Sequence, residues 1–524
     1  MTFFRSMATV SGLTFVSRVL GYARDVLIGS TFGDSGISDV FFQAFRLPNL
    51  FRSLFAEGAL NSAFVPIFGR LYHKEGRLKA LGFARIVFTV LVLILLALIL
   101  LFELNMEGIM SILAPGFKKD PEKFHMVVQF GYIVFPYILF IALSALCSGV
   151  LNSLNRFSAG AAAPILLNLF CIASLVLFSF NALDAGKALS WAVTLAGAAQ
   201  FLWVLWACAR NGMVLTPVRL KMTEELRTLL RRMGPGIAGA GVYQVNLLIS
   251  TGVASFVPMA VSYLAFADRI NQFPLSITGI AIGTVLLPLL TRHAASNRHE
   301  ESIYIQNRVL QFGFTLTVPA TIALFVLSLP IVTVLFQHGR FTSLMSGEVA
   351  KVLSIYALCL PANVAVKILN ANFFSRGNTR TPMIVASFSI LSNLCFIAVL
   401  FPLFSYYGIA MAASLASFVN VGALGYLLYK KQYFKPDERL RKTLPRILVA
   451  AGLMGIFLCG SLSWLNPLWA ESILTDIFLL GLLMGGGGLL YLGLLLLFKG
   501  ASIEEFREVM KRTSEDVSIT EREL

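Results

Sequence analysis

The sequence predicts an all-α polytopic membrane protein with about fourteen transmembrane helices, because apolar segments of bilayer-spanning length, ~20 residues, recur along the chain. Hydrophobic residues make up 57% of the 524 residues, charged residues make up 13%, and the mean hydropathy is +0.79. About a quarter of the residues of an ordinary soluble globular protein are charged. The composition therefore excludes that class.

The predicted spans follow one another with short connections. Two of them, 37–69 and 259–291, are too long for one straight span and contain two prolines each, so we expect bends there. The predicted spans are 8–32, 37–69, 83–104, 126–152, 157–180, 188–209, 234–256, 259–291, 307–336, 348–374, 382–402, 407–429, 445–465 and 474–498.

Lysine and arginine residues are distributed unevenly between the loops. With the N-terminus in the cytoplasm, 30 of the 42 fall in cytoplasmic segments, 5 on the opposite side and 7 within spans. Cytoplasmic loops of membrane proteins carry an excess of these residues, so both termini are predicted to be cytoplasmic. The same distribution explains most of the formal net charge of +15, which therefore does not indicate nucleic-acid binding.

The two halves of the chain resemble each other at a nearly constant offset. Arg46 and Pro66 correspond to Arg269 and Pro288, with offsets of 223 and 222. A six-span unit repeated in the same orientation is therefore predicted, and transporters built from such repeats hold substrate at the repeat interface. The predicted division is an N-lobe at 1–210 (spans 1–6), a cytoplasmic amphipathic linker at 211–233, a C-lobe at 234–430 (spans 7–12), spans 13 and 14 within 431–498, and a cytoplasmic tail at 499–524.

Charged side chains lie well inside predicted spans, where a charge at the bilayer centre costs about 2.5–3.5 kcal/mol. Arg18, Arg24 and Asp25 lie in the first span, and Arg52 and Glu57 lie in the second. Snorkelling from helix ends is the alternative explanation. The combination favours a water-filled cationic cavity suited to an anionic substrate.

The second lobe has a counterpart in Asp268 and Arg269, which lie within a long predicted span. A structural ion pair in the helical bundle is one interpretation. The other places Arg269 across the cavity from Arg24 and Arg52, where planar guanidinium groups would bind diphosphate oxygens bidentately. The nearby carboxylates would hold these arginines in orientation when the site is empty: Asp25, Glu57 and Asp268.

The sequence gives no indication of catalysis. The six cysteines lie in apolar segments without paired spacing, and the five histidines lack metal-ligand spacing. Gly485–Gly488 is not followed by the Lys-Ser/Thr of a phosphate loop, and small residues in a span let helices approach closely. We find no Ser/His/Asp arrangement and no aspartate-rich motif, so we expect no enzyme activity, no metal and no cofactor.

Three strings carry a resemblance to a known family: SRVLGYARD (Ser17–Asp25), FRLPNLFRSLFAEGALNSAFVPIF (Phe45–Phe68) and ADRINQFP (Ala267–Pro274). The chain resembles, over essentially its whole length, the MurJ (MviN) family of lipid II flippases in the multidrug/oligosaccharidyl-lipid/polysaccharide exporter superfamily. The resemblance implies a MATE-like fold in the bacterial cytoplasmic (inner) membrane. It also implies a role in peptidoglycan biosynthesis, in which undecaprenyl-diphosphate-linked precursor moves to the outer leaflet by alternating access.

The resemblance further implies roles for individual residues. The substrate-binding residues would be Arg18, Arg24, Arg52 and Arg269, the last three at the diphosphate. The gating or charge-balancing residues would be Asp25, Asp39, Glu57 and Asp268. Spans 13 and 14 would form, with the second lobe, a hydrophobic groove for the lipid tail.

Some family members are thought to bind sodium through an acidic residue in span seven. Here that span offers Asn246 and Ser250 but no carboxylate, so a sodium site is not supported. We expect the membrane potential or an ion gradient to drive transport.

The expected partners are lipid II and anionic membrane lipids, the latter at the amphipathic segment Lys221–Met233. We expect no nucleic acid, and a monomer acting near the cell-wall synthesis machinery. Two alternatives stay open: a flippase for another polyprenyl-linked oligosaccharide, and a MATE-type antiporter. A cationic drug would be repelled by the arginines, which disfavours the antiporter.

Overall fold

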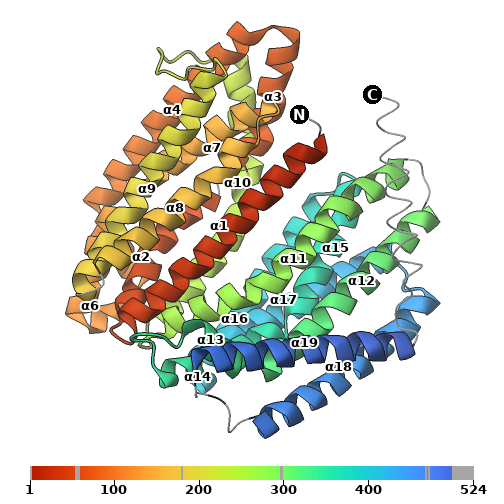
Figure 1. Cartoon of the computed structure of the whole chain (residues 1–524). Coiled ribbons are helices and arrows are strands. Elements are labelled where there is room, and N and C mark those ends of the chain that lie inside the picture. The colour runs from red at the N-terminus through yellow and green to blue at the C-terminus, as the bar shows by residue number, and fades with distance from the viewer. Residues whose placement is uncertain are drawn as a thin grey trace. The chain divides into compact units, whose positions relative to one another are not determined.

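The computed structural model describes residues 3–53, 59–178, 181–295, 299–465, 469 and 472–498. For some of these residues, including 279–295 and 299, it describes the backbone but not the side chain. Every regular element among these residues is a helix (Figure 1). The predicted all-α fold class is therefore confirmed. The predicted tail at 499–524 lies outside the described residues.

The chain divides into two compact units. The first comprises Met1–Ala265 and Phe336–Met345, and the second comprises Phe266–Leu335 and Ser346–Leu524. The predicted lobe boundaries at 210 and 234 stay a prediction.

The first unit contains the helices that carry most of the predicted site. Within it α1 packs along α8, and α9 packs against both α7 and α8. The helices are α1 (Phe3–Phe32), α2 (Ile37–Arg52), α3 (Ala59–Lys74), α4 (Arg77–Leu104), α5 (Met106–Leu113), α6 (Pro121–Val134), α7 (Tyr137–Ser153), α8 (Ser158–Leu177), α9 (Ala182–Arg210) and α10 (Glu224–Ala254), with a 3₁₀ turn at Pro115–Lys119.

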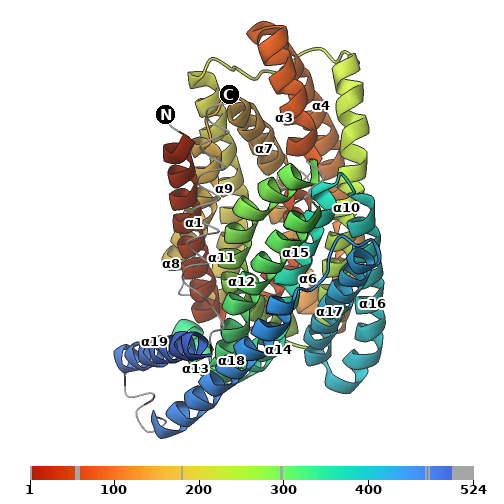
Figure 2. The ribbon, with the colours of Figure 1, turned by 90° about the vertical axis from the view of Figure 1, so that its right-hand side faces the viewer.

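The second unit begins within α11 and contains the rest of the helices. In it α16 pairs with α17, and α12 packs against α15 and α18. The last two helices, α18 and α19, pack together (Figure 2). The helices are α11 (Ala260–Ala295), α12 (His299–Val326), α13 (Ser328–Phe336), α14 (Ser343–Ala357), α15 (Leu360–Ser375), α16 (Arg380–Phe404), α17 (Tyr406–Lys430), α18 (Glu438–Leu465) and α19 (Ile473–Leu497).

Several predicted spans are divided into two helices. Span 126–152 becomes α6 and α7, which are separated at Pro136, and span 348–374 becomes α14 and α15, with Pro361 in the first turn of α15. Proline has no backbone N–H and its ring crowds the preceding turn, so a new helix starts readily at such a position. The helices α2 and α3 divide span 37–69 on either side of residues 54–58, which lie outside the described residues.

Ten helical segments in the described part are long and apolar enough to cross a bilayer, judged by length and composition. They correspond to predicted spans 3–6 and 9–14. Predicted spans 1, 2, 7 and 8 are not among them, and part of the side chains of α10 and α11 lies outside the described residues. The count of fourteen is therefore not confirmed.

The predicted amphipathic segment forms the start of α10. The Thr223 hydroxyl accepts a hydrogen bond from the backbone N–H of Leu226 and caps the helix. Leu226 and Leu229 are buried, whereas Arg231 is exposed. The helix continues without interruption to Ala254, so this segment and predicted span 7 form one helix.

Candidate functional site

Arg24 lies in α1 and is held by two side chains. Its Nε and Nη2 atoms donate hydrogen bonds to Asp25 Oδ1 at 2.9 and 2.7 Å. Its Nη1 atom donates to Asn168 Oδ1 of α8 at 3.2 Å. The side chain of Arg24 is 11% exposed and that of Asp25 is 4% exposed. The two groups therefore form a largely buried ion pair inside the first unit.

Asn168 connects this pair to the backbone of α1. Its Nδ2 atom donates to the carbonyl oxygen of Ser17 at 2.9 Å, while its Oδ1 atom accepts from Arg24. The side chain is fixed at both ends because α1 packs along α8. Three of the five guanidinium N–H groups of Arg24 are used by Asp25 and Asn168, which leaves two for an anion.

The other predicted cationic residues of the first unit are in different surroundings. Arg18 is exposed on α1. Arg52 is partly buried at the end of α2, where its Nε atom donates to Asn49 Oδ1 at 2.8 Å. Glu57, predicted to balance the charge of these arginines, lies outside the described residues.

The predicted residues of the second unit are Asp268 and Arg269 on α11, and both are exposed. Asp268 Oδ2 accepts a hydrogen bond from Gln272 Nε2 at 2.6 Å, one helical turn away. The placement of Arg269 across a cavity from Arg24 and Arg52 stays a prediction.

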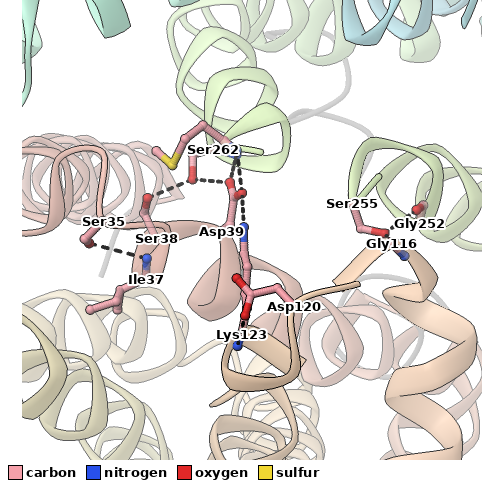
Figure 3. Close-up of polar contacts among 11 residues, drawn as sticks. Ser35, Ile37, Ser38, Asp39, Gly116, Asp120, Lys123, Gly252, Ser255 and Ser262 are labelled. Carbon is pink, nitrogen blue, oxygen red and sulfur yellow. Dashed lines mark hydrogen bonds and ion pairs between the residues drawn. The ribbon is translucent and has the colours of Figure 1, made fainter. Parts of the chain in front are cut away.

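Asp39 is the most completely enclosed of the predicted charged residues that the structure describes. Figure 3 shows its polar contacts. Its carboxylate accepts hydrogen bonds from Lys123 Nζ at 2.8 Å and from the backbone N–H groups of Met259 and Ser262, each at 2.8 Å. The Ser262 hydroxyl lies 2.7 Å from Asp39 Oδ1. Asp39 thus caps the beginning of α11 from a different helix, where a negative charge is stabilised by the helix dipole.

Lys123 neutralises this carboxylate from the first turn of α6. Its ammonium lies 4.3 Å from the centroid of the Phe117 ring, and its side chain is 13% exposed. Asp120 Oδ1 accepts the backbone N–H of Lys123 and caps α6. The three segments that meet at Asp39 are therefore α2, α6 and the start of α11.

The sequence analysis missed two residues of these clusters. Asn168 lies in the apolar run PILLNLFCIAS. A polar side chain within a predicted span often indicates a functional residue, so this position could have been selected from the sequence. By its position in the sequence, Lys123 is one of the five cations predicted on the side opposite the cytoplasm. Nothing in its local sequence indicates that it would reach Asp39, 84 residues away.

Comparisons with known proteins identify the family of the chain. A family model described as "Lipid II flippase MurJ" matches residues 28–480. The chain is 39% identical over 527 residues to a "Probable lipid II flippase MurJ" of Rhizobium meliloti (strain 1021), covering 99% of this chain and 98% of that protein. It is 34% identical over 468 residues to a "Lipid II flippase MurJ" of Burkholderia cenocepacia, covering 87% of this chain and 90% of that protein.

Solved structures extend the comparison to the fold. A structure titled "Lipid II flippase MurJ, inward closed conformation" matches with a TM-score of 0.77 and 26% identity, over 93% of this chain and 98% of that one. An inward-facing MATE-family transporter matches with a TM-score of 0.63 and 14% identity, over 81% of this chain and 96% of that one, which shows a shared fold. With a family model matched over most of its length and full-length relatives above 30% identity, this chain belongs to the lipid II flippase MurJ family.

Proposed function

We propose that this protein is a lipid II flippase that moves undecaprenyl-diphosphate-linked peptidoglycan precursor from the inner to the outer leaflet of the bacterial cytoplasmic membrane by alternating access. The observation that carries the proposal is its membership of the MurJ family over nearly its whole length. The buried Arg24–Asp25–Asn168 cluster supports it. A charged side chain inside a transmembrane helix costs free energy, and such residues usually have a functional role.

The diphosphate is the part of the substrate that these residues suit. Arg24, Arg52 and Arg269 bind its oxygens, and Arg18 lines the approach to them. Arg24 is pre-oriented by Asp25 and Asn168, so little side-chain freedom is lost when an anion binds. Asp25 keeps the charge of Arg24 compensated while the site is empty.

Asp39, Glu57 and Asp268 act as gating or charge-balancing residues. Asp39 supports this role best, since its carboxylate joins α2 and α6 to the first turn of α11. A contact of this kind that forms in one state of the cycle and breaks in another would bias the equilibrium between the states. Both chain termini are cytoplasmic, and the protein acts as a monomer near the cell-wall synthesis machinery, with anionic lipids at its cytoplasmic surface.

The proposal is tested in cells depleted of this protein and complemented with wild type, with Arg24→Ala/Arg52→Ala, or with Arg219→Ala as a control at an exposed loop position. Lipid II in the outer leaflet is measured with an externally added lipid II-cleaving enzyme. Wild type and Arg219→Ala restore cleavage and the double variant does not, while all three reach the same level in the membrane. If cleavage continues during depletion, lipid II is not the cargo.

The same cells distinguish the alternative cargo. A flippase for a different polyprenyl-linked oligosaccharide would leave lipid II cleavage unchanged on depletion and would instead reduce the surface polysaccharide built from that oligosaccharide.

A further inference from the structure

The hydroxyl group of Tyr137 is buried without a hydrogen-bond partner in the part of the chain that the structure describes. The residue begins α7, directly after Pro136, and its side chain is 0% exposed. Buried hydroxyl groups are nearly always hydrogen-bonded, because burial without a partner costs free energy. This group therefore needs an explanation beyond packing.

The ring of Tyr137 is fixed in place by its neighbours. The Phe45 ring of α2 lies 6.0 Å away between centroids. A Cβ atom at Gly197 of α9 would lie only 2.6 Å from Tyr137 Cδ2, so the phenol packs directly against the backbone of α9. With the ring held between two other helices, the hydroxyl has little freedom to find a partner by moving.

Two of the predicted substrate-binding arginines influence Tyr137 electrostatically. Both Arg52 and Arg24 lie close enough to act electrostatically on Tyr137, and Cys171 of α8 is the third neighbour. Arg24 donates three of its five N–H groups to Asp25 and Asn168, and the Nε atom of Arg52 donates to Asn49. Guanidinium groups have no acceptor, so neither arginine can accept a hydrogen bond from Tyr137.

We propose that Tyr137 is a further substrate-binding residue, whose hydroxyl donates a hydrogen bond to a diphosphate oxygen held by Arg24 and Arg52. The inference rests on the proposed function and adds to it a neutral donor from α7. An anion bound by both guanidinium groups would bring acceptor oxygens to this hydroxyl, which has no hydrogen-bond partner among the described residues. A phenol O–H adds a directional bond to this anion without adding charge to the empty site.

The proposal predicts that Tyr137→Phe weakens diphosphate binding without lowering the stability of the folded protein. Tyr137→Phe removes one oxygen and keeps the ring contacts with Phe45 and Gly197. Removing an unsatisfied buried hydroxyl leaves the folded protein as stable as wild type or more stable. Losing a hydrogen bond to a charged ligand weakens binding about tenfold or more. A merely structural tyrosine would not separate the two effects in this way.

The experiment measures equilibrium binding to the full-length detergent-solubilised protein by native mass spectrometry. The probes are purified lipid II, undecaprenyl diphosphate, and undecaprenol, which has the same tail without phosphate. The variants are Tyr137→Phe and, as a matched control, Tyr132→Phe, whose side chain is exposed on α6. Thermal unfolding of each variant is measured in the same detergent.

We expect Tyr137→Phe to bind both diphosphate lipids about tenfold more weakly, to bind undecaprenol unchanged, and to unfold at the same or a higher temperature than wild type. Tyr132→Phe should match wild type in every assay. If Tyr137→Phe and wild type bind both diphosphate lipids equally, the role of Tyr137 is refuted while the proposed function stands. The role of Tyr137 is also refuted if the variant binds undecaprenol more weakly, or if it unfolds at a lower temperature than wild type. If wild type binds lipid II no more tightly than undecaprenol, the proposed function fails as well.

Discussion

Arg24 shows how one charged residue is maintained inside an apolar helix. Asp25 is adjacent in sequence and supplies the opposite charge, and Asn168 supplies a neutral acceptor from another helix. Burying an ion pair is favourable only when the remaining polar groups are also satisfied. Asn168 satisfies one further N–H group of Arg24 and at the same time fixes the direction in which the guanidinium points.

The first prediction concerns Asn168. Asn168→Leu has a similar volume but removes the bonds to Arg24 and to the Ser17 carbonyl oxygen. We expect lipid II to bind about tenfold more weakly because the guanidinium loses its orientation, with a loss of folding stability of about 1–3 kcal/mol from the unpaired groups. Binding to the purified protein and thermal unfolding measure the two effects.

The control for this prediction is Asn105→Leu, since Asn105 is exposed and its side chain donates a hydrogen bond to the Leu101 carbonyl oxygen one turn earlier in its own helix. Binding by Asn168→Leu equal to that of the control would show that Asn168 does not position Arg24.

At the scale of elements, Asp39 caps the start of α11 from another helix. The N–H groups at the start of a helix need acceptors, and here a carboxylate of α2 accepts from Met259 and Ser262. Met259 adopts a positive φ of 63°, a conformation that costs free energy in a non-glycine residue. The cap therefore holds a strained turn as well as a helix end.

The second prediction compares the two members of the Asp39–Lys123 pair. Asp39→Asn leaves the largely buried ammonium of Lys123 without its opposite charge, so we expect a loss of up to about 3–5 kcal/mol in folding stability. Lys123→Met should cost less, because three other donors still stabilise the Asp39 carboxylate. Thermal unfolding of both single variants and of the double variant gives the coupling between them.

The exposed pair Glu75–Lys79 is the matched control. Its groups lie 2.8 Å apart with side chains 39% and 69% exposed, so we expect a coupling below about 1 kcal/mol. A coupling for Asp39–Lys123 no larger than that of the control would refute the role of Asp39 in joining α2, α6 and α11.

At the scale of the molecule, we propose that the negative charge of the substrate couples transport to the membrane potential. An inside-negative potential favours outward movement of net negative charge by ~2.3 kcal/mol per charge per 100 mV. The empty cationic site would be drawn inward by the same field. Span seven offers no carboxylate for sodium, so the potential is the expected driving force.

The third prediction is that collapsing the potential slows lipid II translocation severalfold. In vesicles containing the purified protein, a potassium gradient with an ionophore sets the potential, and exposure of lipid II at the outer surface is measured over time. Transport should slow severalfold without the potential and should not change when sodium is replaced by choline. Equal rates with and without the potential would exclude this driving force.

The sequence alone determined the helical class, the approximate positions of the helices and the residues that carry charge into them. These properties depend on composition and on hydrophobic runs of bilayer length, which are local. The motif strings around Arg24, Arg52 and Arg269 indicated the family, which the comparisons showed. The uneven distribution of Lys and Arg predicts the orientation of the termini. This property is also local, because the rule counts the Lys and Arg residues in short loops next to the spans.

Only the tertiary structure decided which polar groups meet. Asn168 reaches Arg24 across 144 residues of sequence, and Asp39 reaches Ser262 across 223. Tyr137 appeared in the sequence as one aromatic residue among many, and only packing against Phe45 and Gly197 isolates its hydroxyl beside two arginines. Such contacts depend on how the helices pack. The pattern of apolar residues that drives packing does not specify which polar side chains come into contact.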